Sequence, residues 1–329
     1  MVRIDEIKTI AMIGAGVMGS GIAQTFAQAG YEVRLHARYE ETLRAARERI
    51  AANQEAMVRA GLLTEGAARD ALTRIRTTTK LEEAARGCHY VNESVPEDLG
   101  LKREVFAALD RHAPRDAVLS TDTSGLPITA IAAATGRPEM VVGLHWMNPP
   151  HLMPPVEVIR GERTADGVMD LTCELARRIG RVPIRVEKDA PGFLWNRLQL
   201  ALVREAVYVV EQGIASPEAV DLAVTAGLGL RWAAVGPLRI MDLAGLATFH
   251  AVASYLYPNL CAAQEPNASL AAKVAAGETG ARSGRGFYVY PPAQAEAAVA
   301  ARDARLFELL KVFRPPDLRR EKATGERPG

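Results

Sequence analysis

A histidine and a glutamate lie on two apolar runs that a proline-rich segment joins. His145 ends the run Val141–His145, and Glu157 lies inside the run Val156–Ile159. If the runs pair as a hairpin, the carboxylate can bind one ring nitrogen of the histidine and orient the ring as a general base. Taken alone, an ordinary buried histidine and a surface glutamate are the commoner interpretation. The pair therefore needs support from elsewhere in the chain.

A glycine-rich loop near the N-terminus supplies that support. The apolar run Thr9–Ile13 leads into Gly14-x-Gly16-x-x-Gly19, and helical spacing follows at once. The first glycine allows a tight turn, the second lets the backbone approach a diphosphate, and the third lets helix and strand pack closely. A nicotinamide cofactor would give the histidine a reaction, since hydride removal from a carbinol needs a base for the hydroxyl proton. We predict that the cofactor is held by Gly14, Gly16, Val17, Met18 and Gly19.

The residues after the second predicted strand bear on which cofactor binds. A carboxylate is expected there to hold the adenosine ribose of NAD, but the strand Glu32–His36 is followed by Ala37 and Arg38. An arginine without a neighbouring carboxylate can pair with a 2′-phosphate, which favours NADP. The alternative is that Arg38 is solvated and that Glu40 or Glu41 reaches the ribose. Both NAD and NADP therefore stay open.

The elements that must position these residues alternate between strand-like and helical patterns. This alternation predicts an α/β fold, a Rossmann-type doubly wound sheet domain over residues 1–188. A helical hairpin extends it at 41–75, broken at Gly61 and restarted at Thr64. An all-helical domain is predicted over 189–313, and a disordered tail over 314–329. The predicted strands are Thr9–Ile13, Glu32–His36, Tyr90–Val91, Ala117–Thr121, Val141–His145, Val156–Ile159 and Val182–Val186.

Composition excludes several partners. The 329 residues carry a net charge of +1, which gives no electrostatic case for nucleic acid or an anionic membrane. Three widely spaced cysteines without a CxxC pair indicate neither a disulfide framework nor a metal site. The longest uncharged stretch, Leu243–Gln264, contains His250 and Pro258 and is typical of a soluble helix and its end. With no apolar leader before Thr9, we expect a cytoplasmic protein.

Ordered motifs from Ile7 to about Tyr290 make the chain resemble the L-3-hydroxyacyl-CoA dehydrogenase family. The matching segments are Ile13–Gly19, Ser120–Ser124, Gly143–His145 with Asn148-Pro149, Val156–Ile159, Lys188–Phe193 with Asn196-Arg197, and Gly284–Tyr288. The resemblance implies NAD-dependent oxidation of an L-3-hydroxyacyl compound to its 3-oxo product, in fatty acid metabolism. It also implies a homodimer formed through the helical domain.

Carried over residue by residue, the resemblance implies roles for individual side chains. His145 is the general base, Glu157 is its partner, and Ser124 and Asn196 bind the reacting oxygen. Glu97, Lys102 and Asn148 lie near the nicotinamide ribose, and Arg282 lies near the cofactor. Without the resemblance, a turn serine, a helix-start asparagine and solvated charges are the commoner interpretations of such residues.

Three departures from the family pattern concern the cofactor and the substrate. The acidic residue after the second strand is absent, Pro154-Pro155 replaces a lysine before the glutamate, and the segment Gly229–Pro237 is longer than usual. The long segment is similar to that of carnitine dehydrogenase, gulonate dehydrogenase with lambda-crystallin, and a pyridoxine-degradation dehydrogenase. The substrate is therefore either a 3-hydroxyacyl-CoA or a free small hydroxy compound.

Two other classes of protein compete with this prediction. The β-hydroxyacid dehydrogenases share the cofactor loop but use a lysine at the start of the second domain, and no lysine lies between Lys188 and Lys273. A crystallin-like protein would keep the fold with little turnover. Retention of all four catalytic candidates argues against that loss of activity.

Overall fold

The computed structural model describes residues 1–313. The tail predicted to be disordered, residues 314–329, lies outside the described residues. The chain forms two compact units, one of Met1–Leu194 together with the chain from Arg302, the other of Trp195–Ala301.

The division between the units differs from the expected boundary near Asp189. Phe193 is only 3% exposed and belongs to a core cluster of the first unit, so the chain leaves that unit after Leu194. The last helix, α14 (Pro292–Val312), also passes into the first unit at Arg302. The second unit is therefore shorter at both ends than the predicted domain 189–313.

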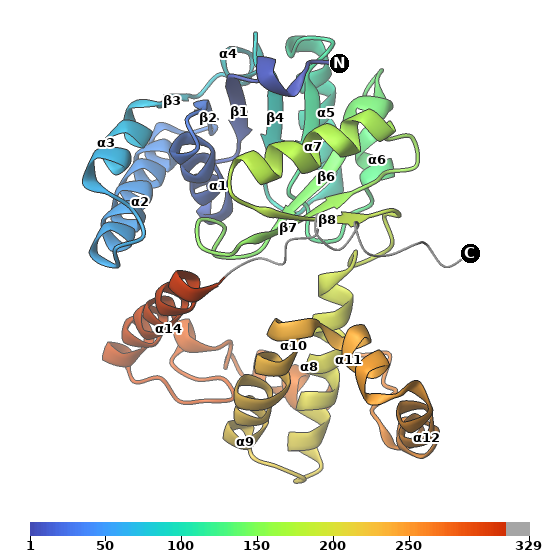
Figure 1. The fold of residues 1–329 in the computed structure, drawn as a ribbon. Helices are drawn as coiled ribbons and strands as arrows, with labels where there is room; N and C mark the ends of the chain where they lie inside the picture. The colour runs from blue at the N-terminus through green and yellow to red at the C-terminus, as the bar shows by residue number, and fades with distance from the viewer. Residues whose placement is uncertain (314–329) are drawn as a thin grey trace. The chain divides into compact units, whose positions relative to one another are not determined.

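The first unit is built on an eight-stranded sheet with the order β3-β2-β1-β4-β5-β6-β7-β8. All neighbouring strands are parallel except β6 and β7, which pair antiparallel. The order reverses direction between β1 and β4, which confirms the predicted doubly wound arrangement (Figure 1). The strands are β1 (Thr9–Ile13), β2 (Glu32–His36), β3 (Ile75–Thr78), β4 (Tyr90–Glu93), β5 (Val118–Thr121), β6 (Val141–Trp146), β7 (Pro155–Ile159) and β8 (Val182–Val186).

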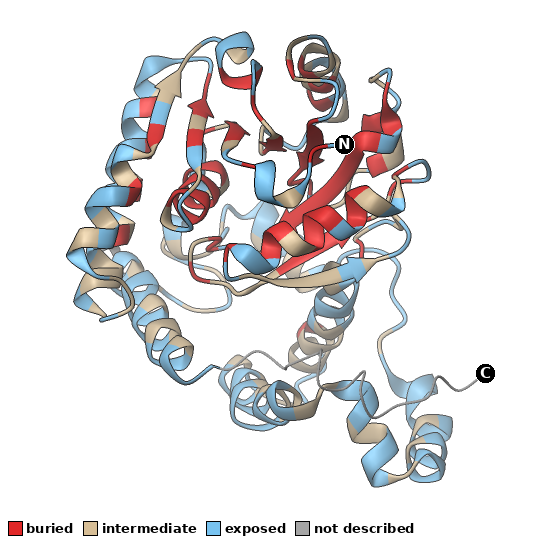
Figure 2. Ribbon diagram, turned by 45° about the horizontal axis from the view of Figure 1, so that its top comes forward, coloured by how far each residue is buried: buried red, intermediate tan, exposed pale blue. Residues whose placement is uncertain are grey.

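Helices cover both faces of the sheet. Successive residues of β1 point to opposite faces, so each face has its own core. Ile10 and Met12 join one core cluster, and Ala11 and Ile13 join the other. The first face packs against α1 (Val17–Gln28), α2 (Glu40–Arg59), α3 (Glu65–Thr73) and α7 (Asp166–Arg178). The second face packs against α4 (Leu81–Ala85), α5 (Leu99–His112) and α6 (Ile128–Ala132). Figure 2 shows the buried residues concentrated in the strands and in the helix faces against them.

The predicted hairpin 41–75 is wrong at its C-terminal end. Its two helices form as α2 and α3, and Thr64 caps α3 by accepting a hydrogen bond from the Ala67 amide. Ile75, however, begins β3, which pairs with β2 at the edge of the sheet. Sequence patterning missed this strand because only Ile75 of its four residues is buried, so its apolar pattern is almost absent.

The second unit consists of helices with little buried surface of its own. Among its described side chains, Val207 is the only buried hydrophobic one, while leucines such as Leu200 and Leu238 are 62% and 75% exposed. Its helices before α14 are α8 (Trp195–Glu211), α9 (Pro217–Leu222), a π-helical turn (Ala223–Leu228), α10 (Gly229–Val235), α11 (Pro237–Ala244), α12 (Leu246–Leu256) and α13 (Ala268–Ala275).

Among the described residues no single helix has the length and apolar character needed to span a membrane. The stretches Pro217–Val235 and Pro237–Ala244 meet that test only as a pair, bent by 86°.

Candidate active site

The histidine–glutamate pair forms where the antiparallel strands meet. His145 of β6 and Glu157 of β7 are register partners, and His145 Nδ1 lies 2.8 Å from Glu157 Oε2. The glutamate is fully buried and the histidine is 5% exposed. A carboxylate that accepts a hydrogen bond from Nδ1–H favours the tautomer in which Nε2 can take up a proton.

The second oxygen of the Glu157 carboxylate binds the chain at the end of the first unit. The backbone N–H of Leu194 donates to Glu157 Oε1 at 3.0 Å. The ring of the preceding Phe193 packs edge-on against the His145 ring, with centroids 5.8 Å apart. The backbone of Phe193 has a φ of 50°, a value that residues other than glycine rarely adopt. The dyad is therefore held by contacts from both strands and from the segment that leaves the sheet.

The glycine loop has the shape that a dinucleotide requires. A Cβ on Gly14 would lie 2.3 Å from the Ser94 carbonyl oxygen, and one on Gly19 would lie 2.0 Å from the Gly14 carbonyl oxygen. A Cβ on Gly16 would meet nothing within 4 Å, so the space above that residue is open. Beyond it α1 begins at Val17 with unpaired amides, which fits a bound diphosphate.

Two arginines that follow β2 in the chain are candidates for contact with a cofactor. Arg38 follows β2 and is exposed beside the buried Ala37. Arg49, on α2, donates from Nη1 to the Gly16 carbonyl oxygen at 3.3 Å and to Ser20 Oγ at 3.1 Å. Sequence reasoning missed Arg49, because only the packing of α2 on α1 brings it to the loop.

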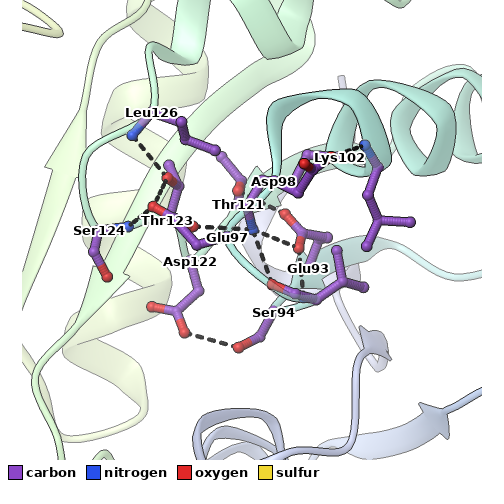
Figure 3. Close-up of polar contacts among 12 residues, drawn as sticks. Glu93, Ser94, Glu97, Asp98, Lys102, Thr121, Asp122, Thr123, Ser124 and Leu126 are labelled. Carbon is purple, nitrogen blue, oxygen red and sulfur yellow. Dashed lines mark hydrogen bonds and ion pairs between the residues drawn. The ribbon is translucent and has the colours of Figure 1, made fainter.

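A buried ion pair closes the carboxyl end of β4. Lys102 Nζ lies 2.8 Å from Glu93 Oε1, and both side chains are fully buried (Figure 3). Glu93 also accepts from Thr121 Oγ1 at 2.6 Å and from the Val95 amide at 2.5 Å. The ammonium of Lys102 is therefore bonded within the protein, and it is Glu97 that is partly exposed, at 43% of its side chain.

The turn that carries Ser124 is bonded to Glu97. Glu97 Oε1 accepts from Thr123 Oγ1 at 2.6 Å and from the Ser124 amide at 2.8 Å. Ser124 itself is exposed. The structure thus brings two of the predicted site residues together, although the sequence predicted no contact between them.

Asp122 is a buried carboxyl group that sequence reasoning did not assign. The Trp146 amide donates to its Oδ1 and Ser94 Oγ donates to its Oδ2, both at 2.9 Å. Burial raises the pKa of Asp122 to about 8, against the lowering effect of these two hydrogen bonds, and the charge on Glu93 raises it further. Its position inside the polar motif Ser120–Ser124 was the available signal.

Three predicted residues lie apart from this network. Asn148 is exposed after β6, and its peptide bond to Pro149 is cis. Asn196, in the first turn of α8, and the exposed Arg282 belong to the second unit. The first unit therefore holds the dyad, the glycine loop and the Ser124 turn.

A glycine cradle after β1 of a doubly wound sheet, in the same unit as a histidine held by a buried carboxylate, characterises a nicotinamide-dependent dehydrogenase. Two family models match the chain: "3-hydroxyacyl-CoA dehydrogenase, NAD binding domain" over residues 9–190, and "3-hydroxyacyl-CoA dehydrogenase, C-terminal domain" over 192–290. The chain belongs to the 3-hydroxyacyl-CoA dehydrogenase family and is an NAD-dependent oxidoreductase of that type.

The relatives differ in what they act on. A 5-formyl-3-hydroxy-2-methylpyridine 4-carboxylate 5-dehydrogenase of Mesorhizobium japonicum is 35% identical over 93% of this chain and 98% of its own length. A probable 3-hydroxybutyryl-CoA dehydrogenase of Bacillus subtilis is 40% identical over 87% of this chain and 98% of its own length. The crystal structure of a 5-dehydrogenase of the first kind, an NAD+ dependent dismutase, has 35% identity and a TM-score of 0.85, covering 94% of this chain and all of its own.

The raised pKa of Asp122 predicts how stability depends on pH. Between pH 3.8, the ordinary pKa of an aspartate, and about pH 8, the folded protein keeps the proton on Asp122, whereas the unfolded chain has lost it. Stability from this group is therefore greatest at low pH and falls as the pH rises through that window. Asp122→Asn keeps an acceptor for the Trp146 amide and removes the titration. We expect the free energy of unfolding of D122N, relative to wild type, to increase by about 2 kcal/mol or more from pH 5 to pH 8.5.

Urea denaturation of both proteins across this range measures the effect. Asp116→Asn, at an exposed aspartate just before β5, is the matched control and should give no such trend. Parallel stability curves for D122N and wild type would show that Asp122 does not titrate in this window.

Proposed function

We propose that this protein oxidises the hydroxyl group of a 3-hydroxyacyl compound to the 3-oxo product, with His145 as the general base and Glu157 as its partner. The observation that carries the proposal is the 2.8 Å contact between His145 Nδ1 and a fully buried carboxylate. An imidazole so held is oriented before substrate binds, and its imidazolium form is stabilised by the adjacent negative charge.

Proton movement in this mechanism runs through the first unit. The substrate hydroxyl proton passes to His145 Nε2 while Nδ1 stays bonded to Glu157. Ser124 hydrogen-bonds the reacting oxygen and so favours its change from hydroxyl to carbonyl. Gly14, Gly16, Val17, Met18 and Gly19 would hold the nicotinamide cofactor, with Asn148 as a further candidate contact, and the bound cofactor would supply the hydride acceptor.

For the substrate class, we propose a free small hydroxy compound rather than a coenzyme A thioester. Two features support this. The pyridine-carboxylate relative matches more of this chain than the hydroxybutyryl-CoA relative does, 93% against 87%. Pro154 and Pro155 also stand where the resemblance expects a lysine, so one candidate cation for an anionic coenzyme tail is absent from that position. The thioester is the competing substrate in every assay below.

Turnover tests this assignment. Appearance of NAD(P)H is followed with 3-hydroxybutyryl-CoA, 3-hydroxybutyrate, carnitine, gulonate and a hydroxymethylpyridine carboxylate. We expect His145→Ala to lower kcat by at least about two orders of magnitude on any compound that wild type oxidises, because general-base catalysis typically contributes that much. Glu157→Gln should lower kcat less, since the amide oxygen can still accept a hydrogen bond from Nδ1–H.

The matched control is His112→Ala on α5, which should keep wild-type turnover. Near-wild-type kcat in H145A would overturn the role of the base. Absence of turnover by wild type on the whole panel would favour the crystallin-like alternative.

For the cofactor, we propose that Arg38 allows the protein to use NADP as well as NAD. The buried Ala37 and exposed Arg38 give a 2′-phosphate a cation without a carboxylate at the position where NAD-specific proteins place one. We expect Arg38→Ala to lower kcat/KM for NADP at least tenfold, with little change for NAD. Arg44→Ala, at an exposed arginine one turn along α2, serves as control. If wild type used NAD at least tenfold more efficiently than NADP, the proposal would be wrong.

We also propose that the protein is a homodimer through the helical unit. Exposed leucines on three helices support this: Leu198 of α8, Leu230 of α10 and Leu243 of α11 are 60%, 69% and 72% exposed. A lone soluble unit rarely exposes so much apolar surface. Sedimentation velocity should give twice the chain mass of 35.5 kDa. A monomer at micromolar concentration would contradict the dimer.

A further inference from the structure

We propose that Glu97 is a positioning residue of the reaction, and that it acts through Ser124. Its carboxylate holds the turn Thr123–Gly125 and thereby sets where the Ser124 hydroxyl lies. The inference rests on the role proposed above for Ser124. It gives Glu97 a task separate from contact with the cofactor.

Three donors of one turn converge on a single oxygen of Glu97. Oε1 accepts from Thr123 Oγ1 at 2.6 Å, from the Ser124 amide at 2.8 Å and from the Gly125 amide at 3.2 Å (Figure 3). Hydrogen bonds to an ionised acceptor are stronger than those between neutral groups. The backbone on both sides of the Ser124 side chain is therefore bonded to one carboxylate from another loop.

Thr123 also holds the turn from within. Thr123 Oγ1 accepts from the Leu126 amide at 3.0 Å and, at a longer 3.4 Å, from the Gly125 amide. These bonds fold the turn onto Thr123, but Thr123 in turn donates its hydroxyl proton to Glu97. Removing the carboxylate would thus take away the acceptor that the Thr123 hydroxyl and the amides of Ser124 and Gly125 share.

Glu97 is itself anchored by a buried cation. Its Oε2 lies 3.6 Å from Lys102 Nζ, which is fully buried and paired with Glu93. Asp98, the next residue, caps α5 by accepting from the Leu101 amide at 2.7 Å. The carboxylate is therefore held next to the N-terminus of α5, although its side chain is 43% exposed. A group held in this way can transmit a fixed position to the turn it binds.

Small displacements of a substrate-binding hydroxyl are costly to a reaction. A misplacement of about 1 Å can lower a rate by about 10²-fold, because the reacting groups then leave the productive geometry. Loss of Glu97 should therefore impair catalysis through Ser124 even when the cofactor still binds.

A double-mutant cycle tests this coupling. The variants are Glu97→Ala, Ser124→Ala and the double variant, with Glu97→Gln as the conservative change and Glu104→Ala, at an exposed glutamate of the same helix, as matched control. For each, kcat/KM is measured on the panel compound that wild type oxidises, and NADH affinity is measured by fluorescence titration. Hydrogen exchange of the peptide covering residues 120–127 is measured without substrate.

We expect E97A to lower kcat/KM at least tenfold in the wild-type background and less than threefold in the S124A background. E97Q should fall between E97A and wild type, because the amide oxygen still accepts neutral hydrogen bonds. NADH affinity should stay within threefold, and exchange in the 120–127 peptide should speed up at least tenfold in E97A and remain unchanged in E104A.

Three results would overturn the inference. One is independent effects, with E97A costing as much in S124A as in wild type. Another is an NADH affinity weakened more than tenfold with unchanged peptide exchange, which would make Glu97 a cofactor ligand only. The third is wild-type kcat/KM in E97A. If S124A alone kept wild-type turnover, the role proposed for Ser124 would fail instead, and accelerated exchange in E97A would still report the contact.

Discussion

The carboxylate of Glu157 is the interaction on which the site depends. It is fully buried, so its charge is stable only if both oxygens find donors, and His145 and the Leu194 amide each bond one of them. That requirement fixes the register of β6 against β7, because a slip of one residue would turn the two side chains to opposite faces of the sheet. It also fixes where the chain leaves the first unit.

The other polar groups gather where parallel strands end together. Glu93 is the last residue of β4, and Asp122 directly follows β5. These strands are parallel neighbours, so both side chains lie at the carboxyl edge of the sheet. Lys102, in the first turn of α5, forms an ion pair with the Glu93 carboxylate. Doubly wound sheets bind their ligands at this edge, next to the point where strand order reverses. The glycine loop after β1 lies against the same loops, since Gly14 has room only for hydrogen beside Ser94.

The two units differ in how they are stabilised. The first has core clusters on both faces of its sheet, with side chains such as Phe26 and Phe106 fully removed from solvent. The second exposes most of its large apolar side chains and buries only Val207 among its described hydrophobic residues. This exposed apolar surface of the second unit supports the homodimer proposed above. The unit that holds the dyad carries its own core.

The sequence by itself determined the fold class, the glycine loop and the pairing of His145 with Glu157, because strand periodicity and a short connection specify a hairpin locally. It missed β3, whose edge position leaves almost no apolar pattern. Only the tertiary structure showed that Glu97 binds the Ser124 turn, that Asp122 is buried, and that Arg49 reaches the glycine loop. Such contacts join residues tens of positions apart, and no local pattern encodes them, because they arise only when separate strands and helices pack at one edge of the sheet.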